Sequence, residues 1–326
     1  MVNLIVSNYP FPEYEPETRA AVINTCLKIK QYFAVHDNIL VSYSGGSDSD
    51  CIVHLICKYF PEHLEKCRFV FVNTGLEYAA TKRHVNEIAQ KYRISIETIR
   101  GKSVVSVIRQ YGIPVLSKLK SDRAEAYLQG KPWGIRYVKP DEEFKKHFRN
   151  DAIFNANQIA MVDYCKEHGI MISARCCKLS KKKPLHDYMK SNQIDLNVTG
   201  ERKAEGGQRS LTHQSCFEIH KDGMNKYMPL WWWSETVKAD FKVKEGLQYS
   251  DCYEIWGMKR TGCVGCPFNL HIADALVMMK QYEPLMYKAC MNVFGESYRL
   301  MDEFQCRKKK CLPEYFQLTL EGGETK

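Results

Sequence analysis

The sequence predicts an α/β fold with a doubly wound parallel sheet, because apolar runs and helical patterns alternate along its first third. Two runs rich in β-branched or aromatic residues, at 39–41 and 67–73, indicate buried strands, and each is followed by a turn and then by a helix. A third run at 94–99 completes the series. Sheets of this kind have right-handed crossovers and bind ligands at the carboxyl ends of their strands. The turns at 44–46 and 73–75 fall at such ends.

The first of these turns carries the strongest local signal. Residues 44–49 read Ser-Gly-Gly-Ser-Asp-Ser, and apolar residues at helical spacing begin at Cys51. Glycines allow backbone N–H groups to approach an anion, and a helix N-terminus adds partial positive charge. The string has neither the Gly-Lys-Ser/Thr of a Walker loop nor the spacing of the dinucleotide fingerprint. We therefore expect a phosphate-binding loop, and a plain structural turn is the alternative.

The pattern divides the chain into three parts. Residues 1–35 are expected to form an arm and a helix, residues 36–225 a nucleotide-binding domain, and residues 226–326 a mostly helical, cysteine-bearing portion. Residues 112–150 have no clear apolar period, so we expect an insertion or a mobile flap there. The other predicted elements are a strand at 194–199 and helices at 18–33, 103–111, 154–168, 234–245, 273–282 and 285–293.

Composition narrows the class of protein. The chain has 326 residues, 44% of them hydrophobic, so it can bury a large core. It has no uninterrupted apolar stretch of about 18 residues and no basic segment followed by an apolar run at its start, which predicts a cytoplasmic protein. Its 14 cysteines are then expected to be thiols, metal ligands or redox groups rather than disulfides.

The charge of the chain favours anionic partners. The formal net charge is +9, and Lys and Arg are concentrated at 178–183 and 307–310. Such clusters attract a charged nucleotide or a nucleic acid, although a solvated basic surface is an equally simple interpretation of either cluster alone. The sequence contains no internal repeat, so a solenoid is not expected.

Four cysteines have the spacing of a metal or cluster site. Cys176 and Cys177 are adjacent, and Cys263 and Cys266 form a C-x-x-C turn in which glycine and proline shape the backbone. Zinc and a [4Fe–4S] cluster both accept four thiolates, so the ligand count does not choose between them. Ligand pairs of structural zinc usually have two to four residues between them, and the vicinal pair therefore favours iron and sulfur. A pair of core cysteines beside an unrelated zinc turn is the alternative.

These motifs resemble those of a known family. The string at residues 44–49 resembles the PP-loop, the pyrophosphate-binding signature of N-type ATP pyrophosphatases and of the phosphoadenosine phosphosulfate reductase family. The Cys-Cys pair followed by C-x-x-C is similar to the cluster motif of assimilatory adenylyl sulfate reductases. Together the two motifs span residues 40–268 in the family's order. The resemblance implies an adenine nucleotide alpha hydrolase-like, Rossmann-like fold, an adenine nucleotide substrate and a [4Fe–4S] cluster on the four cysteines.

The resemblance also implies a set of nucleotide contacts. Gly200-Glu201-Arg202 with Arg209 is similar to the family's Gly-x-Arg segment and later arginine, and guanidinium groups suit phosphate or sulfate. Pro229-Leu230 before three tryptophans is similar to another family segment, where packing is a simpler role for tryptophan than base stacking. The implied nucleotide-binding residues are Ser42, Ser44, Gly45, Gly46, Ser47, Asp48, Ser49, Thr74, Gly75, Glu77, Gly200, Arg202 and Arg209. For Thr74, Gly75 and Glu77, a plain strand-ending turn is the alternative.

One departure from the family pattern affects the predicted chemistry. Sulfonucleotide reductases attack the sulfuryl group with a cysteine on a C-terminal tail, and residues 313–326 contain no cysteine. Cys306 and Cys311 flank the basic run 307–310, and a cationic neighbour can lower the pKa of a thiol. Either residue could be a substitute nucleophile, and a surface cysteine in a basic helix is the simpler interpretation.

The first functional hypothesis is a PP-loop enzyme that splits ATP between its α and β phosphates and activates an acceptor as its adenylate. Loop amides would hold pyrophosphate, Asp48 would bind Mg²⁺, and Arg202 and Arg209 would offset charge in the transition state. The cluster would hold or deliver sulfur, and a tRNA or DNA acceptor would bind the basic clusters. A sulfur-donor protein is a further expected partner.

Two other hypotheses remain open from the sequence. The chain could be a sulfonucleotide reductase that acts on adenylyl sulfate or its 3′-phosphorylated form and releases sulfite. It could also be a nucleotide-sensing or nucleic-acid-binding module without turnover. The missing tail cysteine favours the ATP-cleaving enzyme over the reductase.

Overall fold

The computed structural model describes residues 10–147, 153–206 and 214–312, which form two compact units. Unit 1 comprises residues 1–72, 79–99 and 184–261, and unit 2 comprises residues 73–78, 100–183 and 262–326. Each unit is therefore built from three chain segments. The boundaries predicted at residues 35 and 225 do not coincide with those of the units.

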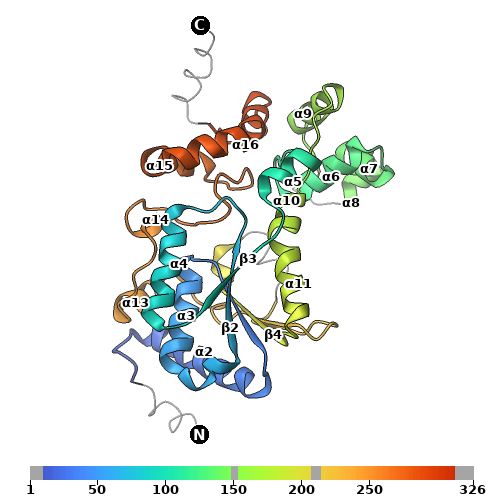
Figure 1. Ribbon diagram of the computed structural model, residues 1–326. Helices are drawn as coiled ribbons and strands as arrows, with labels where there is room; N and C mark the ends of the chain where they lie inside the picture. Colours follow the sequence, from blue (N-terminus) through green and yellow to red (C-terminus); the bar gives the residue numbers. More distant parts are fainter. Residues whose placement is uncertain (1–9, 148–152, 207–213, 313–326) are drawn as a thin grey trace. The chain divides into compact units, whose positions relative to one another are not determined.

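Unit 1 is organised around a mostly parallel six-stranded sheet of order β3-β2-β1-β4-β6-β5 (Figure 1). β1 lies between β2 and β4 and is parallel to both, β6 is parallel to β4, and β5 is antiparallel to β6. The strand bounds are β1 (Ile39–Tyr43), β2 (Cys67–Asn73), β3 (Ile96–Arg100), β4 (Leu196–Thr199), β5 (Phe217–Glu218) and β6 (Asn225–Tyr227). The predicted strands and the α/β fold class are confirmed.

Helices cover both faces of this sheet, as a doubly wound fold requires. α2 (Pro16–Val35), α3 (Ser47–Tyr59) and α4 (Ala79–Tyr92) lie on one side, and α11 (Lys183–Ser191) lies on the other (Figure 1). The order of strands reverses at β1, so the loop after β1 lies at the topological switch point, where such sheets bind ligands.

The alternation of side chains along β1 explains its central position. Ile39, Val41 and Tyr43 are buried in the larger core with α2 and α3, whereas Leu40 is buried in a smaller core with Met189 of α11. Successive side chains of a strand point to opposite faces, so a strand that is apolar on both faces belongs in the middle of the sheet.

The third segment of unit 1 adds two further helices, α13 (Glu235–Lys244) and α14 (Asp251–Glu254). Trp231 and Trp233 precede them and are buried, whereas Trp232 is 54% exposed. The indole Nε1–H of Trp233 donates to Thr25 Oγ1 of α2 at 2.9 Å. The packing role predicted for the tryptophans is confirmed for Trp231 and Trp233. Short 3₁₀ turns complete the unit at Pro61–Lys66 and Lys203–Glu205.

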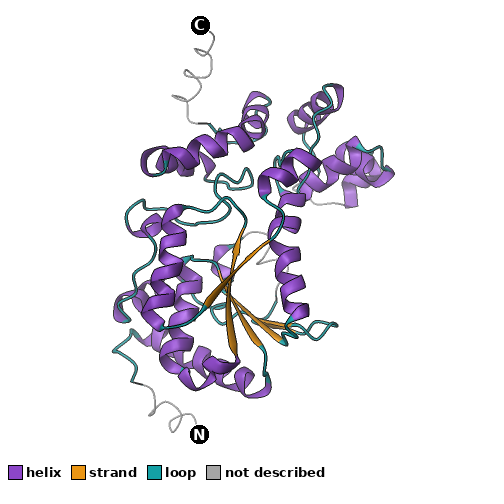
Figure 2. Cartoon of the chain, in the orientation of Figure 1, coloured by secondary structure: helices purple, strands orange, loops and turns teal. Residues whose placement is uncertain are grey.

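The described part of unit 2 consists of helices and loops, apart from an isolated bridge between Ile113 and Ile172 and the last residues of β2 and β3 (Figure 2). Its helices are α5 (Val104–Tyr111), α6 (Lys118–Leu128), α7 (Pro132–Val138), α8 (Glu142–His147), α9 (Ala156–Glu167), α10 (Arg175–Cys177), α15 (Ile272–Tyr282) and α16 (Pro284–Glu303). A π-helical turn, Lys178–Lys182, joins α10 to α11.

The segment expected to be an insertion or a mobile flap, residues 112–150, contains α6, α7 and α8 in its described part, although its sequence has no clear apolar period. The buried positions of α6 include Ser121, Arg123 and Ala124, and α7 buries Gly134. Small, polar and charged residues at core positions conceal the helical period of the sequence. No helix in the described ranges is long and apolar enough to cross a membrane.

Candidate functional site

The loop after β1 is shaped by Ser49. The Ser49 hydroxyl donates to Gly46 O at 2.7 Å and accepts from Gly46 N at 3.2 Å and Ser44 N at 3.3 Å. The hydroxyls of Ser44 and Ser49 lie 3.0 Å apart. These bonds fold residues 44–49 back onto the first turn of α3. The sequence predicted the helix start correctly, and Ser49 stabilises it.

Both glycines of the loop are required by its surroundings. Gly45 has φ +67°, and a Cβ atom there would lie 2.7 Å from Thr81 Cγ2 of α4. A Cβ atom at Gly46 would lie 3.1 Å from the hydroxyl of Tyr253 in α14. Helices on either side thus come so close to the loop that a side chain at Gly45 would displace α4 or the loop.

Asp48 is the centre of a charged cluster in unit 1. Its Oδ1 accepts from Arg202 Nε at 2.7 Å and lies 2.7 Å from Lys238 Nζ. Lys238 Nζ also donates to Ser47 Oγ at 2.6 Å, and Arg202 pairs with Glu235 at 2.8 Å. Burial lowers the pKa of Arg202, but Asp48 and Glu235 outweigh burial, so the pKa is raised overall. Two fixed cations therefore lie beside the loop.

The Gly200–Arg202 segment reaches this loop from the end of β4. A Cβ atom at Gly200 would lie 3.0 Å from Ser49 N, so glycine allows the two backbones to approach. The structure thus brings the predicted Gly200 and Arg202 to the loop. Ser42 instead donates to Asn197 Oδ1 at 2.8 Å, which joins β1 to β4. The predicted Arg209 lies outside the described residues.

A buried polar network lies next to the loop. Asp50, in the first turn of α3, accepts from Tyr43 OH at 2.7 Å and lies 2.9 Å from His84 Nε2 of α4. Burial lowers the pKa of His84, but the hydrogen bond and charge of Asp50 outweigh it, so the pKa is raised overall. This network joins β1, α3 and α4 next to the loop at residues 44–49.

Three residues of the site were missed by sequence reasoning. Lys238 lies in a helix that the sequence did predict, but periodicity alone does not say which helical turn meets a loop far away in the chain. Tyr253 and Thr261, whose hydroxyls lie 2.9 Å apart, also border Gly46. No local signal in the sequence marks any of the three.

Thr74, Gly75 and Glu77 belong to unit 2, where they form a turn of their own. The Thr74 hydroxyl donates to Glu77 Oε1 at 2.8 Å, and Gly75 has φ +88°. Gly75 N donates to Asn73 Oδ1 at 2.9 Å. A contact between these residues and the nucleotide stays a prediction.

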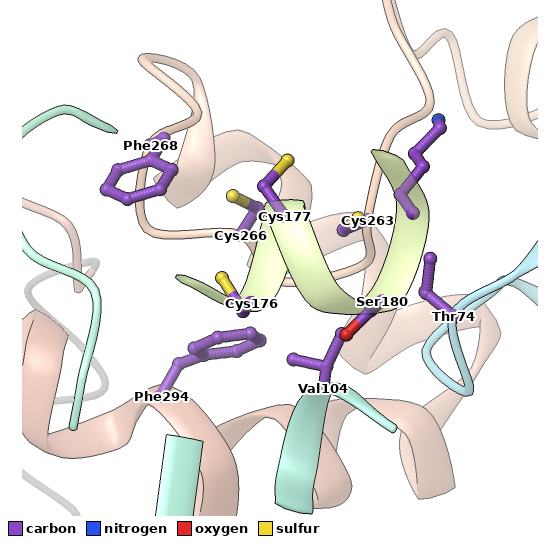
Figure 3. A pocket seen from close by; sticks show the side chains of 10 residues that line it. Thr74, Val104, Cys176, Cys177, Ser180, Cys263, Cys266, Phe268 and Phe294 are labelled. Atoms are coloured by element: carbon purple, nitrogen blue, oxygen red, sulfur yellow. The ribbon is translucent and has the colours of Figure 1, made fainter. Parts of the chain in front are cut away.

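The four predicted cysteines meet in unit 2, where they line one small cavity (Figure 3). Cys176 and Cys177 lie on one helical turn, with Cys263 and Cys266 on the loop beside it. The rest of the lining is Thr74, Val104, Ser180, Lys181, Phe268 and Phe294. The Ser180 hydroxyl is buried and has no hydrogen-bond partner within the described residues.

The C-x-x-C loop is fixed by contacts inside unit 2. Cys266 N donates to Cys263 O at 3.2 Å, and Val264 N donates to Leu76 O at 3.1 Å. Gly265 has φ +68°, and a Cβ atom there would lie 2.7 Å from Cys290 Sγ of α16. A side chain at Gly265 would therefore push the loop away from α16.

Burial raises the pKa of three of these thiols. It raises the pKa of Cys176 and of Cys263 to about 12 and that of Cys266 to about 11. Thiols with such pKa values stay protonated near neutral pH unless a cationic centre binds them. In the described ranges, no group of three or more His, Cys, Asp or Glu side chains is arranged to hold one metal ion.

Cys306 and Cys311 differ from their predicted setting. Both are buried, and α16 ends at Glu303, before either of them. Burial raises the pKa of each thiol to about 12, despite the charge of Arg307. The guanidinium of Arg307 is instead engaged by backbone carbonyl groups, among them Leu116 O at 2.9 Å. The predictions of a surface position and a lowered thiol pKa are therefore wrong.

The fold and the loop define the class of protein, a doubly wound α/β protein with a double glycine and a helix N-terminus at the switch point of its sheet. A family model described as the phosphoadenosine phosphosulfate reductase domain matches residues 38–121 and 136–269. The chain belongs to this family.

Two curated relatives come from Methanocaldococcus jannaschii. The uncharacterized protein MJ0066 is 25% identical over 285 residues, which are 87% of this chain and 45% of that protein. The uncharacterized protein MJ0973 is 23% identical over 265 residues, 80% of this chain and 49% of that protein. The chain thus spans about half the length of these relatives.

Two solved structures are similar to this chain at low sequence identity. Phosphoadenylyl-sulfate reductase from Candida auris has a TM-score of 0.43 and 14% identity, covering 73% of this chain and 87% of that chain. The U34-tRNA thiolase NcsA from Methanococcus maripaludis, solved with its [4Fe–4S] cluster, has a TM-score of 0.38 and 11% identity, covering 90% and 82%.

Proposed function

We propose that this chain is a PP-loop enzyme that cleaves ATP between the α and β phosphates, releases pyrophosphate and activates an acceptor as its adenylate. The observation that carries the proposal is the charged cluster at Asp48, where Arg202 and Lys238 lie beside the loop at the switch point of the sheet. Fixed cations beside a cradle of backbone amides are suited to the charge that develops on a leaving pyrophosphate.

In the proposed mechanism, amides of residues 44–49 bind the pyrophosphate group, and Gly45 and Gly46 keep side chains out of its path. Arg202 and Lys238 would offset the charge of the phosphate oxygens, and Asp48 would bind the Mg²⁺ that accompanies ATP. Glu235 holds one end of the Arg202 guanidinium in place. Arg209 is proposed as a further cation on the basis of its sequence position alone.

We further propose that Cys176, Cys177, Cys263 and Cys266 hold a [4Fe–4S] cluster. The donor set fits, because all four thiols line one cavity together with Ser180 Oγ, which has no hydrogen-bond partner in the described part of the chain. The vicinal pair Cys176-Cys177 favours iron and sulfur over structural zinc, whose ligand pairs usually have two to four residues between them. When bound, such a cluster supplies a site that holds and delivers sulfur.

The acceptor proposed for this chemistry is a nucleic acid, either tRNA or DNA. The net charge of +9 supports a polyanionic partner, and a separate protein would supply the sulfur. The cytoplasmic location expected from the sequence belongs to the same proposal.

A sulfonucleotide reductase is the second candidate, since the family model that matches the chain is named for that activity. This reaction needs a nucleophilic thiolate. Burial opposes that role for Cys306 and Cys311, and residues 313–326 contain no cysteine. The ATP-cleaving reaction makes no such demand.

The test is anaerobic incubation of the purified chain with ATP and Mg²⁺, followed by assay of pyrophosphate with and without added RNA or DNA. Pyrophosphate formation that is lost in Asp48→Asn and kept in Asp222→Asn, an exposed carboxylate of the same unit, supports the proposal. Turnover by Asp48→Asn at the wild-type rate would refute the assignment of the loop. Metal analysis that finds zinc without iron would refute the cluster.

A further inference from the structure

The charge of the chain is segregated between its two units. Unit 2 contains 26 Lys and Arg residues against 17 Asp and Glu, whereas unit 1 contains 21 of each. The whole formal charge of +9 therefore belongs to unit 2, and unit 1 is formally neutral. The electrostatic potential near unit 2 is therefore more positive than it would be if the same charge were spread over the whole chain. A polyanion is attracted to unit 2 for this reason.

One surface in unit 2 adds exposed apolar groups to this charge. On α7, the indole of Trp133 is 48% exposed and Ile135 is 41% exposed. Lys131, directly before the helix, and Arg136, within it, are exposed as well. We call these four residues the α7 surface. Trp133 and Arg136 are three positions apart, so they lie on neighbouring turns of one helix face. A half-exposed tryptophan with a cation one turn away is typical of sites where an aromatic ring stacks on a nucleic-acid base.

The helix that carries this surface is held rigidly. A Cβ atom at Gly134 would lie 2.4 Å from the backbone nitrogen of Tyr127, so α7 packs against α6 with no room for a side chain between them. The guanidinium of Arg123 lies 3.6 Å from the ring centroid of Tyr137, which joins the two helices again. Because Val138 is fully buried, the other face of α7 is anchored in unit 2. Trp133 is thus presented on a fixed platform.

We propose that the α7 surface binds an unpaired segment of nucleic acid, with Trp133 stacked on a base and Lys131 and Arg136 beside the phosphates. An unpaired segment is required because the faces of bases in a duplex are covered by their neighbours. An acidic peptide would match the charge but would leave the indole without a flat partner. This inference gives the acceptor of the proposed function a docking surface, and in that sense rests on it, although binding needs neither ATP nor cluster.

The experiment measures binding by fluorescence anisotropy to 12-nucleotide single-stranded RNA, to single-stranded DNA of the same sequence, and to the corresponding duplex. We expect either single strand to bind more tightly than the duplex. Trp133→Ala should weaken single-strand binding about 5- to 100-fold, the effect of removing one stacking platform. Trp133→Phe, which keeps an aromatic ring, should recover most of the loss. Lys131→Ala with Arg136→Ala should make the salt dependence shallower by about 1.4 in log–log slope.

Trp232 offers a matched control. It is 54% exposed and has Lys203 Nζ at 4.9 Å from its ring centroid, but it lies in the neutral unit 1. Trp232→Ala should leave binding unchanged. The proposal would be overturned if Trp133→Ala bound with wild-type affinity or if Trp232→Ala lost as much affinity as Trp133→Ala. It would also be overturned if the duplex bound more tightly than the single strands, or if polyglutamate displaced the bound single strand as well as nucleic acid does. Thermal melting of each variant identifies a folding defect, which Trp133→Phe avoids. Binding is measured without ATP, so pyrophosphate assays with saturating nucleic acid report separately on the proposed reaction.

Discussion

The carboxylate of Glu245, at the end of α13, is fully buried and supports unit 1 through four donors. Lys58 Nζ, Tyr59 OH and His54 Nε2 each lie 2.6 Å from its oxygens, and Tyr14 OH donates as well. Burial alone would raise the pKa of this carboxyl group, but the hydrogen bonds outweigh burial and lower the pKa from 4.5 to about 2.

This shift gives the magnitude of the prediction. A carboxyl group whose pKa is lower in the folded than in the unfolded chain stabilises the fold above its unfolded pKa, and the contribution falls as pH drops toward the folded pKa. The drop from 4.5 to about 2 corresponds to about 3 kcal/mol at pH 7 and about 2 kcal/mol at pH 3.5. Glu245→Gln removes the charge but keeps the shape of the side chain.

The assay is urea denaturation of the wild-type chain and Glu245→Gln at pH 7 and pH 3.5. We expect the loss in free energy of unfolding to be about 3 kcal/mol at pH 7 and smaller at pH 3.5. Glu62→Gln, on an exposed 3₁₀ turn, should change the free energy by less than about 0.5 kcal/mol. A loss below 1 kcal/mol at pH 7, or one that does not shrink at pH 3.5, would refute this reasoning.

Three further predictions follow from the loop and the buried thiols. Gly45 and Gly169 share φ +67°, but of these two only Gly45 has a neighbour within 4 Å of an added Cβ. In urea denaturation, Gly45→Ala should therefore lose about 1–3 kcal/mol more free energy of unfolding than Gly169→Ala, and equal losses would contradict this. The raised pKa of His84 stabilises the fold fully below about pH 6.5, and this contribution is lost as pH rises through the folded pKa. The loss in free energy of unfolding caused by His84→Gln should therefore decrease as pH rises, and a loss that stays constant with pH in urea denaturation would contradict this. Cys306 and Cys311 should resist iodoacetamide at pH 8 until the chain is unfolded, as mass spectrometry can show, and rapid labelling of the native chain would disprove their burial.

The sequence predicted the parts of the fold that depend on local patterns. β2 has the predicted bounds, Cys67–Asn73, and the loop at residues 44–49 ends a strand and begins a helix as expected. These elements were accessible because strand propensity, glycine and helical spacing act within a few residues. The four cysteines could also be grouped, since C-x-x-C and a vicinal pair are local signals of a shared site.

The rest depended on contacts between distant segments. Lys238 lies 190 positions after Asp48, and only the folded unit shows that its ammonium group meets the carboxylate. Burial of Cys311 likewise depends on tertiary packing, whereas the adjacent lysines alone suggested a surface. α6 was missed because it buries Ser121 and Arg123, whose polar character conceals the core-facing side of a helix.

The most direct test of the central claim is to follow the phosphates of ATP labelled at the γ position, in anaerobically prepared chain with Mg²⁺ and a nucleic-acid acceptor. Cleavage between the α and β phosphates predicts labelled pyrophosphate, matched by an equal amount of unlabelled AMP that is either free or joined to the acceptor. Both products should be lost in Asp48→Asn. Labelled orthophosphate with ADP, or sulfite released from adenylyl sulfate while ATP stays intact, would contradict the account.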